Sequence, residues 1–169
     1  NDQNAQAESF EYRCASVLRE ASRHTALFFM HGNRDFLVGQ TLMSFCHSRL
    51  LDDPTVLCFL NQRWLLSHGD ALCLDDTAYM QFRRLVRGSA WQEAFMAQPL
   101  AKRQAVAADI RRQSEARKQL ERQDYADVDA KAAREWLTAA RSPMLIHGHT
   151  HRPATHALDQ GLARTVLSD

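Results

Sequence analysis

The sequence lacks the features that mark a secreted or membrane-spanning protein. No apolar run approaches the roughly 20 residues that a spanning helix needs, and the first residues show neither the basic start nor the apolar core of a secretory signal. The four cysteines form no Cys-x-x-Cys pair and sit mostly among apolar neighbours, at positions 14, 46, 58 and 73. We therefore expect reduced core cysteines in a cytoplasmic protein, whose membrane contact would be peripheral.

A net charge of only +1 gives no general argument for a nucleic-acid partner, and we expect none. The distribution of charge is more informative. Between Arg83 and Arg122 there are ten basic residues and four acidic ones, so this segment carries +6 and the remainder −5. A basic segment on a mildly acidic body suggests an anionic ligand or surface, although a solvated helix face is the other interpretation.

The chain has 169 residues, of which 45% are hydrophobic and 24% charged, with no repeat and no low-complexity segment. These values are typical of one soluble domain with a sizeable core. Helical spacing of apolar residues predicts helices at 8–22, 38–47 and 128–140. Short apolar runs predict strands at 26–30, 56–60, 64–67 and 144–146.

The connections between these elements are also predicted. A turn at Asn61-Gln62 joins the second and third strands into a hairpin. The segment 75–125 has the composition of two or three helices, with breaks near 87–89 and at Gln98-Pro99. The tail predicts another hairpin, in which 154–158 returns through Asp159-Gln160-Gly161 to 163–167.

One local pattern occurs three times: a short apolar strand followed by His-Gly, at His31-Gly32, His68-Gly69 and His147-Gly148. These pairs use three of the six glycines in the chain. Ligands of open α/β sheets bind beyond the carboxyl ends of the strands. We therefore expect the three turns to converge on one site.

The residues around these turns favour metal-assisted hydrolysis of a phosphoryl ester. Asn33, His68, His147 and His149 are nitrogen and carbonyl donors suited to transition metals. Asp35 and Asp70 are carboxylates that either add anionic ligands or orient their neighbours. Arg34 offers a planar fork for a phosphate. A metal pair would lower the pKa of a bridging water and stabilise the attacking and leaving oxygens.

The motifs also carry a family resemblance. Gly32-Asn33-Arg34-Asp35, His68-Gly69-Asp70 and Gly148-His149-Thr150-His151 resemble, in order and separation, the third, fourth and fifth motifs of the calcineurin-like metallophosphoesterases. Residues 31–37, 68–76 and 146–153, with Tyr79, are most similar to the branch of that family that hydrolyses the pyrophosphate of UDP-linked diacyl glucosamine in lipid A biosynthesis. This resemblance runs nearly end to end and includes a helical insertion between the last two metal motifs.

The resemblance implies roles for individual residues. Asn33, His68 and His147 would bind one Mn²⁺ and His149 a second, while Arg34 would hold the phosphate. The implied catalytic residues are Asn33, Arg34 and His147, which also contact substrate. The remaining implied substrate contacts are Asp76, Tyr79, Ser114 and Lys118. His31 and His151 match no ligand position, and we interpret them as supporting residues.

The chain departs from the family pattern at three places. Members begin with an Asp-x-His and then a Gly-Asp strand end, which supply three ligands including the bridging Asp, and neither occurs before Glu8. The final strands of the family are not found after Leu167-Ser168-Asp169. Glu121 stands where a lysine is expected, so that Arg117 or Arg122 would have to compensate. We expect a fragment that alone binds at most one metal and is inactive.

The predicted architecture is an α/β calcineurin-like metallophosphoesterase sandwich, with a core at 1–74 and 126–169 and a helical cap at 75–125. The predicted activity is Mn²⁺-dependent pyrophosphate hydrolysis of UDP-linked diacyl glucosamine, by a peripheral protein on the cytoplasmic face of the inner membrane. The cap's apolar residues either shelter acyl chains or pack the cap's own helices: Phe82, Leu85, Val86, Trp91, Phe95 and Met96.

Two alternatives remain open. One keeps the fold but acts on a nucleotide or a phosphoprotein. The other is a metal-poor module that binds a partner through the cap without catalysis.

Overall fold

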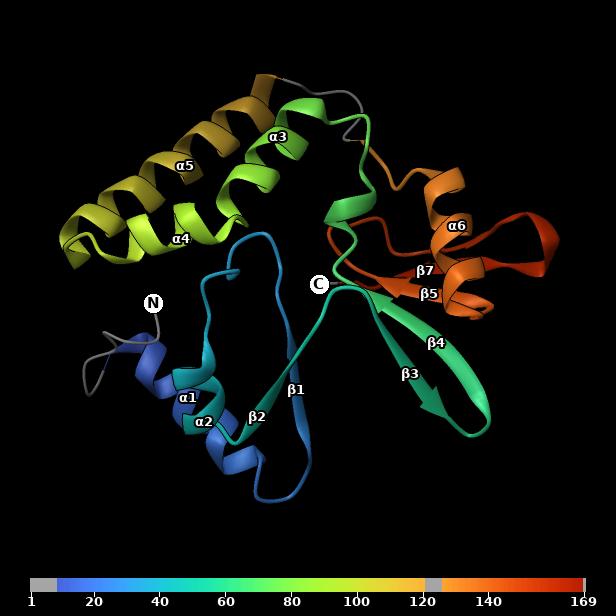
Figure 1. Cartoon of the computed structure of the whole chain (residues 1–169), viewed down its shortest axis with the longest axis horizontal. Helices are drawn as coiled ribbons and strands as arrows, with labels where there is room; N and C mark the ends of the chain where they lie inside the picture. The colour runs from blue at the N-terminus through green and yellow to red at the C-terminus, as the bar shows by residue number, and fades with distance from the viewer. Residues whose placement is uncertain (1–8, 121–125, 169) are drawn as a thin grey trace. The chain divides into compact units, whose positions relative to one another are not determined.

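The computed structural model describes residues 9–120 and 126–168, without the side chains of Glu115 and 117–120. The chain divides into two compact units, one formed by Asn1–Leu72 with Val128–Asp169 and the other by Cys73–Asp127. The predicted cap, 75–125, falls within the second unit. Mixed α/β architecture is confirmed, because both helices and a five-stranded mixed sheet are present (Figure 1).

The first unit begins with two helices and a two-stranded parallel sheet. Their bounds are α1 Phe10–Ala21, β1 Leu27–Met30, α2 Gln40–Phe45 and β2 Ser48–Leu51. Helix α1 starts at Ser9, whose hydroxyl accepts a hydrogen bond from the Tyr12 amide at 3.1 Å. Strands β1 and β2 pair with Leu27 opposite Ser48. Strand β2 was not predicted, because its four residues are few and do not alternate between apolar and polar.

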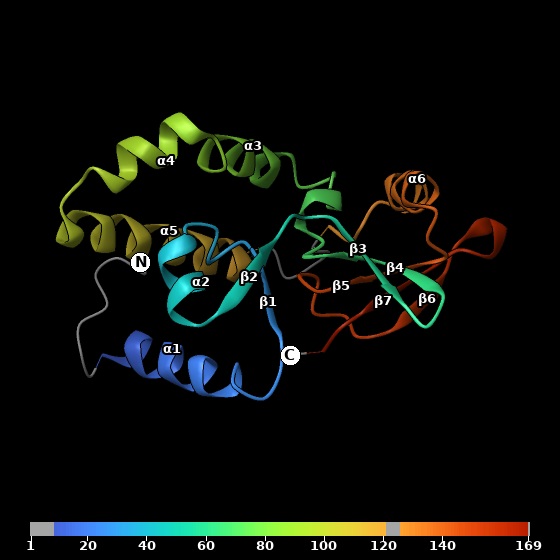
Figure 2. The same ribbon diagram turned by 60° about the horizontal axis from the view of Figure 1, so that its bottom comes forward.

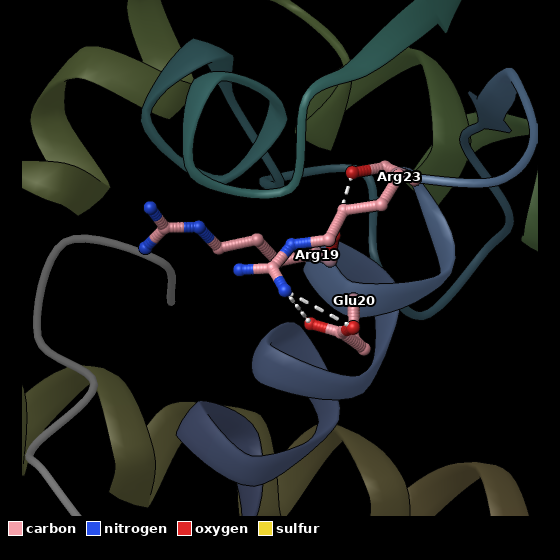
Figure 3. A network of polar contacts seen from close by, with 4 residues as sticks. Arg19, Glu20 and Arg23 are labelled. Atoms are coloured by element: carbon pink, nitrogen blue, oxygen red, sulfur yellow. Dashed lines mark hydrogen bonds and ion pairs between the residues drawn. The ribbon is translucent and has the colours of Figure 1, made fainter.

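Helices α1 and α2 contact each other through Phe45. Its ring lies 5.7 Å from that of Tyr12, and the Arg19 guanidinium sits 5.1 Å from its centroid, a cation–π arrangement. Near the end of α1, Arg23 forms an ion pair with Glu20 at 2.9 Å, drawn in Figure 3. Both of those side chains are largely exposed, so the pair contributes little to stability, while the Phe45 contacts hold the helices together.

The five-stranded sheet has the order β3-β4-β5-β7-β6, and Figure 2 shows these strands side by side. The bounds are β3 Thr55–Phe59, β4 Gln62–Ser67, β5 Met144–His147, β6 Thr155–Ala157 and β7 Ala163–Val166. The central pairs β4–β5 and β5–β7 are parallel, and the outer pairs β3–β4 and β6–β7 are antiparallel.

Both predicted hairpins are confirmed, with one error of position. Phe59 pairs with Gln62, so the turn is Leu60-Asn61 and lies one residue before the predicted Asn61-Gln62. Leu60 and Asn61 have φ of 49° and 60°, as a tight primed turn requires. The error arose because leucine gives no sequence signal for a left-handed backbone. The tail hairpin turns through the short 3-10 helix η3, Asp159–Gly161, as predicted.

Helix α6, Ala130–Ala140, packs against β5 and completes the core of this unit (Figure 1). Asp129 caps it by accepting the Ala132 amide at 2.7 Å. At its other end, Arg63 of β4 donates from Nε and Nη2 to the Ala140 carbonyl at 3.2 and 2.9 Å. Leu137 of α6 and Leu145 of β5 are both fully buried, so the hydrophobic core centres on these two elements.

The second unit is helical, as its composition predicted. Its helices are α3 Thr77–Val86, α4 Ser89–Met96 and α5 Leu100–Leu120, and both predicted breaks are confirmed. Val86 and Phe95 are buried, and Trp91 stacks on Phe95 with ring centroids 4.8 Å apart. These side chains therefore pack the unit itself, whereas Leu85 remains 59% exposed.

The four cysteines are free, but only two of them are core residues. Cys46 and Cys73 are buried, and burial raises the pKa of the Cys46 thiol, which keeps it neutral. Cys14 and Cys58 are exposed, so the prediction of core positions for them was wrong. Their apolar neighbours lie on the surface of α1 and β3, where Val17, Leu57 and Phe59 are also exposed.

In the described part of the chain no helix combines the length and the hydrophobicity that crossing a bilayer requires.

The packing of α6 predicts the effect of a truncation. Leu137→Ala should lower the free energy of unfolding by about 2–5 kcal/mol, since a fully buried leucine loses its contacts and leaves a cavity. Leu60→Ala is the matched control, because Leu60 is 78% exposed. Urea unfolding of both variants measures the difference, and equal losses would show that α6 does not carry the core.

Candidate functional site

The second and third His-Gly turns lie next to each other because their strands are parallel neighbours. Ser67 pairs with His147 at the ends of β4 and β5, so both chains leave the sheet at the same edge. The Gly148 amide donates to the His68 carbonyl at 3.1 Å and joins the two turns directly. The expected meeting of these turns is therefore confirmed.

Gly69 makes this close approach possible. Its φ is +102°, which side-chain-bearing residues rarely adopt. A Cβ at this position would lie 2.8 Å from Nδ1 of His147 and 3.2 Å from the Gly148 carbonyl oxygen. Ser67 fixes the turn from the other side, because its hydroxyl accepts the Gly69 amide at 3.0 Å. The second His-Gly pair thus needs its glycine for packing against the third.

The first turn reaches the same place from a different sheet. Strand β1 pairs only with β2 among the described strands, so the expectation of three strand ends in one open sheet was wrong. The Asn33 amide nevertheless donates to Nε2 of His68 at 3.3 Å. Gly32 lies so close to His68 that an added Cβ would be 3.2 Å from Cε1. The site is therefore assembled from two sheets.

The imidazoles of His68 and His149 form the centre of the site. Their ring centroids are 5.0 Å apart, and the planes meet at 65°. Burial and, after it, the nearby His68 lower the pKa of His149, and Asp70 acts in the opposite direction, so that the pKa of this imidazole is about 4. At neutral pH the His149 ring is consequently uncharged, which is the form that binds metals.

His147 is fully buried, and both its ring nitrogens make polar contacts. Nδ1 lies 2.9 Å from the Gly148 carbonyl oxygen, and Nε2 lies 3.2 Å from Nη1 of Arg164. Arg164 is on β7 and is only 5% exposed. Sequence reasoning missed this arginine, although Arg164 and Val166 alternate along β7 and so share a face.

Three aspartates surround the turns and act on their backbone or charge. The Asp35 carboxylate accepts the Gly32 amide and closes the first turn, which is one of the two roles foreseen for it. Asp53, which sequence reasoning missed, accepts the His68 amide at 3.3 Å. Asp70 is fully buried at the start of the 3-10 helix η2, Asp70–Leu72, close enough to His149 to raise its pKa.

The other residues of the first and third turns lie at the margin. His31 is held by its contact from Nε2 to the Val38 carbonyl at 2.7 Å, which agrees with a supporting role. His151 and Arg34 are exposed. Arg34 directly follows Asn33, whose backbone amide contacts His68, and its role in holding a phosphate stays a prediction.

The predicted substrate residues of the cap belong to the second unit. Asp76 caps α3 by accepting the Tyr79 amide at 2.9 Å, so at least one of its oxygens has a structural task. Ser114 is an exposed residue of α5. Lys118 is also in α5, but its side chain, like that of Arg117, lies outside the described residues, as do Glu121 and Arg122. Their substrate contacts stay predictions.

The donor set suits a divalent transition metal. His149 is neutral, the turns bring Asn33 beside His68, and imidazole with carbonyl oxygen is a common donor combination for Mn²⁺ and related ions. Within residues 9–120 and 126–168, however, no three His, Cys, Asp or Glu side chains are gathered into a group that could hold an ion. The types of donor therefore fit a divalent transition metal, but the side chains of the described residues do not converge on one point.

Comparison with known proteins gives one consistent name. The chain is 50% identical over 155 residues to a UDP-2,3-diacylglucosamine hydrolase of Chromobacterium violaceum, 49% over 152 residues to that of Aromatoleum aromaticum, and 44% over 151 residues to that of Cellvibrio japonicus. These matches cover 91%, 88% and 88% of this chain and 65%, 62% and 63% of the relatives. The chain thus spans somewhat less than two thirds of their length. No protein-family model matches it.

The geometry at Gly69 predicts a selective effect of adding one methyl group. Gly69→Ala should destabilise the fold by more than about 2 kcal/mol, because an unfavourable φ is combined with a clash against His147. Gly161→Ala is the control, with φ of +74° but no atom within 4 Å of the added carbon. Thermal unfolding measures both. If Gly161→Ala destabilises the fold as much as Gly69→Ala does, the clash with His147 is not the cause of the effect.

The lowered pKa of His149 predicts how stability depends on pH in the metal-free protein. Between pH 6.5 and about 4 the unfolded chain binds a proton at this residue that the folded chain does not. The free energy of unfolding should therefore be highest above pH 6.5 and fall as the pH drops towards 4. His149→Gln should flatten this dependence, measured by urea unfolding with a chelator present. His24→Gln, on the surface, controls for the loss of a histidine as such, and a slope unchanged in His149→Gln would refute the assignment.

Proposed function

We propose that the protein carrying this chain hydrolyses the pyrophosphate of UDP-2,3-diacylglucosamine. Water adds across the P–O–P bond and releases UMP and 2,3-diacylglucosamine 1-phosphate. The observation that carries the proposal is the meeting of three turns at His68. The backbone amide of Asn33 and that of Gly148 bond to this residue, and the His149 ring packs edge-to-face against its imidazole. The name shared by the relatives supports the choice of substrate.

The side chains at the turns have distinct tasks in this reaction. Arg34 binds the phosphate through its planar fork, because it is exposed and follows directly on Asn33. Asp35 holds the turn that presents both residues, through the Gly32 amide. Asp53 holds the backbone of His68, so that the imidazole keeps its place beside His149. The protein's contribution is chiefly positioning and charge.

The cofactor that we propose is Mn²⁺. Asn33, His68 and His147 would hold one ion and His149, whose imidazole is uncharged at neutral pH, a second, with imidazole nitrogens as donors. When bound, the metal supplies an activated water and stabilises the charge on the phosphate oxygens. The buried carboxylate of Asp70 keeps a negative charge near His149, which favours a cation at this position.

The helical unit supports the lipid part of the proposal. Leu85 is 59% exposed among Arg83, Arg84 and Arg87, so apolar and cationic groups adjoin on α3. Such a surface suits an acylated, anionic substrate and the anionic cytoplasmic leaflet of the inner membrane. We therefore propose peripheral association there. Asp76, Tyr79, Ser114 and Lys118 are the proposed contacts to the substrate.

Two histidines of the third turn test the proposal. In the protein made as its gene encodes it, His149→Ala should lose bound Mn²⁺ and lower the rate of UMP release more than about 100-fold. This loss exceeds the roughly 10–100-fold that follows when a residue that only hydrogen-bonds to a metal ligand is removed. His151→Ala should keep both properties, because this exposed side chain is not assigned to the metal. Elemental analysis and chromatography of UMP measure the two effects.

The same assay separates the alternatives. The wild-type protein should release UMP from UDP-2,3-diacylglucosamine with Mn²⁺ present and leave a phosphopeptide and a simple nucleotide diester largely untouched. Preference for either of those two compounds would replace the substrate but keep the reaction class. A metal-free protein with no hydrolysis of any of them would instead indicate a binding module.

A further inference from the structure

Arg164 and two histidines lie on the same buried face of the five-stranded sheet. Arg164 of β7 pairs with Leu145 of β5, two residues before His147, and with His156 of β6 on the other side. Alternate residues of a strand share a face, so His147, Arg164 and His156 form a line across three neighbouring strands. This guanidinium is only 5% exposed, and His147 is fully buried. A permanent cation is thus enclosed between two imidazoles.

The contacts of His147 determine where its ring proton lies. A guanidinium carries only donors, so Nε2 of His147 accepts the hydrogen bond from Arg164 at 3.2 Å. Nδ1 then carries the proton and donates to the Gly148 carbonyl at 2.9 Å. An imidazole that binds a metal shows the same pattern, with one nitrogen donating to a backbone carbonyl and the lone pair of the other directed at the ion. Arg164 therefore occupies the lone pair that a metal would use.

His156 offers Arg164 a second acceptor. In the part of the chain that the structure describes, Nε2 of His156 is buried and has no hydrogen-bond partner. Opposite residues of an antiparallel pair have Cβ atoms about 5 Å apart, a distance that an arginine side chain spans easily. A buried polar atom without a partner costs free energy, so a guanidinium that turns towards His156 would gain a bond there.

We propose that Arg164 is a two-position arginine. It bonds to Nε2 of His147 while that residue carries no metal, and it turns to Nε2 of His156 when His147 binds a divalent cation. The inference rests on the proposed function only in taking His147 as a ligand. In the first position Arg164 keeps the ring in the tautomer that the metal needs and competes with the metal. In the second position the competition ends and the buried charge stays bonded. Arg164 acts through His147 and is a positioning residue.

The competition is tested by metal binding without any assay of catalysis. In the protein made as its gene encodes it, Arg164→Met should bind Mn²⁺ about tenfold more tightly in a calorimetric titration, since a charged hydrogen bond no longer has to break. His156→Phe should weaken binding, because the second acceptor is gone. In the Arg164→Met background the His156 substitution should have no effect, so the two changes are coupled. Arg49→Met, on the exposed side of β2, is the control and should leave binding unchanged.

A spectroscopic measurement on the wild-type protein does not depend on the variants folding. Protein with ¹⁵N-labelled histidine is titrated with Zn²⁺, a diamagnetic probe. The Nε2 resonances of His147 and His156 should move together, although only His147 is a ligand. In Arg164→Met only the His147 resonance should move. A His156 resonance that stays in place in the wild type would overturn the proposal.

The outcomes also separate this inference from the proposed function. If His147→Ala abolishes Mn²⁺ binding but Arg164→Met leaves it unchanged or weaker, the two-position arginine is wrong and the metal assignment stands. If His147→Ala leaves Mn²⁺ binding unchanged, the metal assignment of His147 fails and the inference fails with it. If His149→Ala loses the metal while both His147 and Arg164 can be replaced without effect, the site works from His149 alone.

Discussion

The parallel pairing of β4 with β5 is the constraint on which the site depends. It brings the ends of the two strands to the same edge, with Ser67 opposite His147. The residues that follow, His68 and Gly148, therefore lie in contact. This proximity allows the Gly148 amide to bond to the His68 carbonyl, and it requires a residue without a side chain at Gly69. A change that weakens the pairing of β4 with β5 therefore also disturbs the site. Loss of the packing of α6 against β5 is one such change.

The same proximity sets the electrostatics. Several imidazoles share a partly buried volume, and each protonated ring would raise the energy of the next. Burial and His68 both lower the pKa of His149, whereas Asp70 alone raises it among the groups that act on this ring. The balance favours an uncharged His149 ring at neutral pH. A neutral His149 imidazole near the buried carboxylate of Asp70 is a donor that a divalent metal accepts, which is why the arrangement suits a metal better than acid–base chemistry by this histidine.

The His-Gly repeat predicted where the turns meet because it combines two independent requirements. The apolar residues before each pair specify a strand, and the glycine of the second pair, Gly69, allows a close approach that a side chain would block. Element types were predicted well in the helical unit, where composition alone is informative. The separate pairing of β1 with β2 was not predictable, because pairing partners depend on contacts distant in the sequence and β2 shows no pattern of its own.

Arg164 shows why part of a site escapes sequence reasoning. An arginine in a short tail strand is most often solvated, and no motif marks this one. Only the register makes it significant, because pairing with Leu145 and His156 places it on the buried face next to His147. A buried guanidinium is costly unless it is bonded, and Nε2 of His147 supplies an acceptor 3.2 Å away. The need to keep this cation bonded links the chemistry at His147 to the tail hairpin of β6 and β7. That hairpin is therefore part of the site, although none of its residues belongs to a recognised motif.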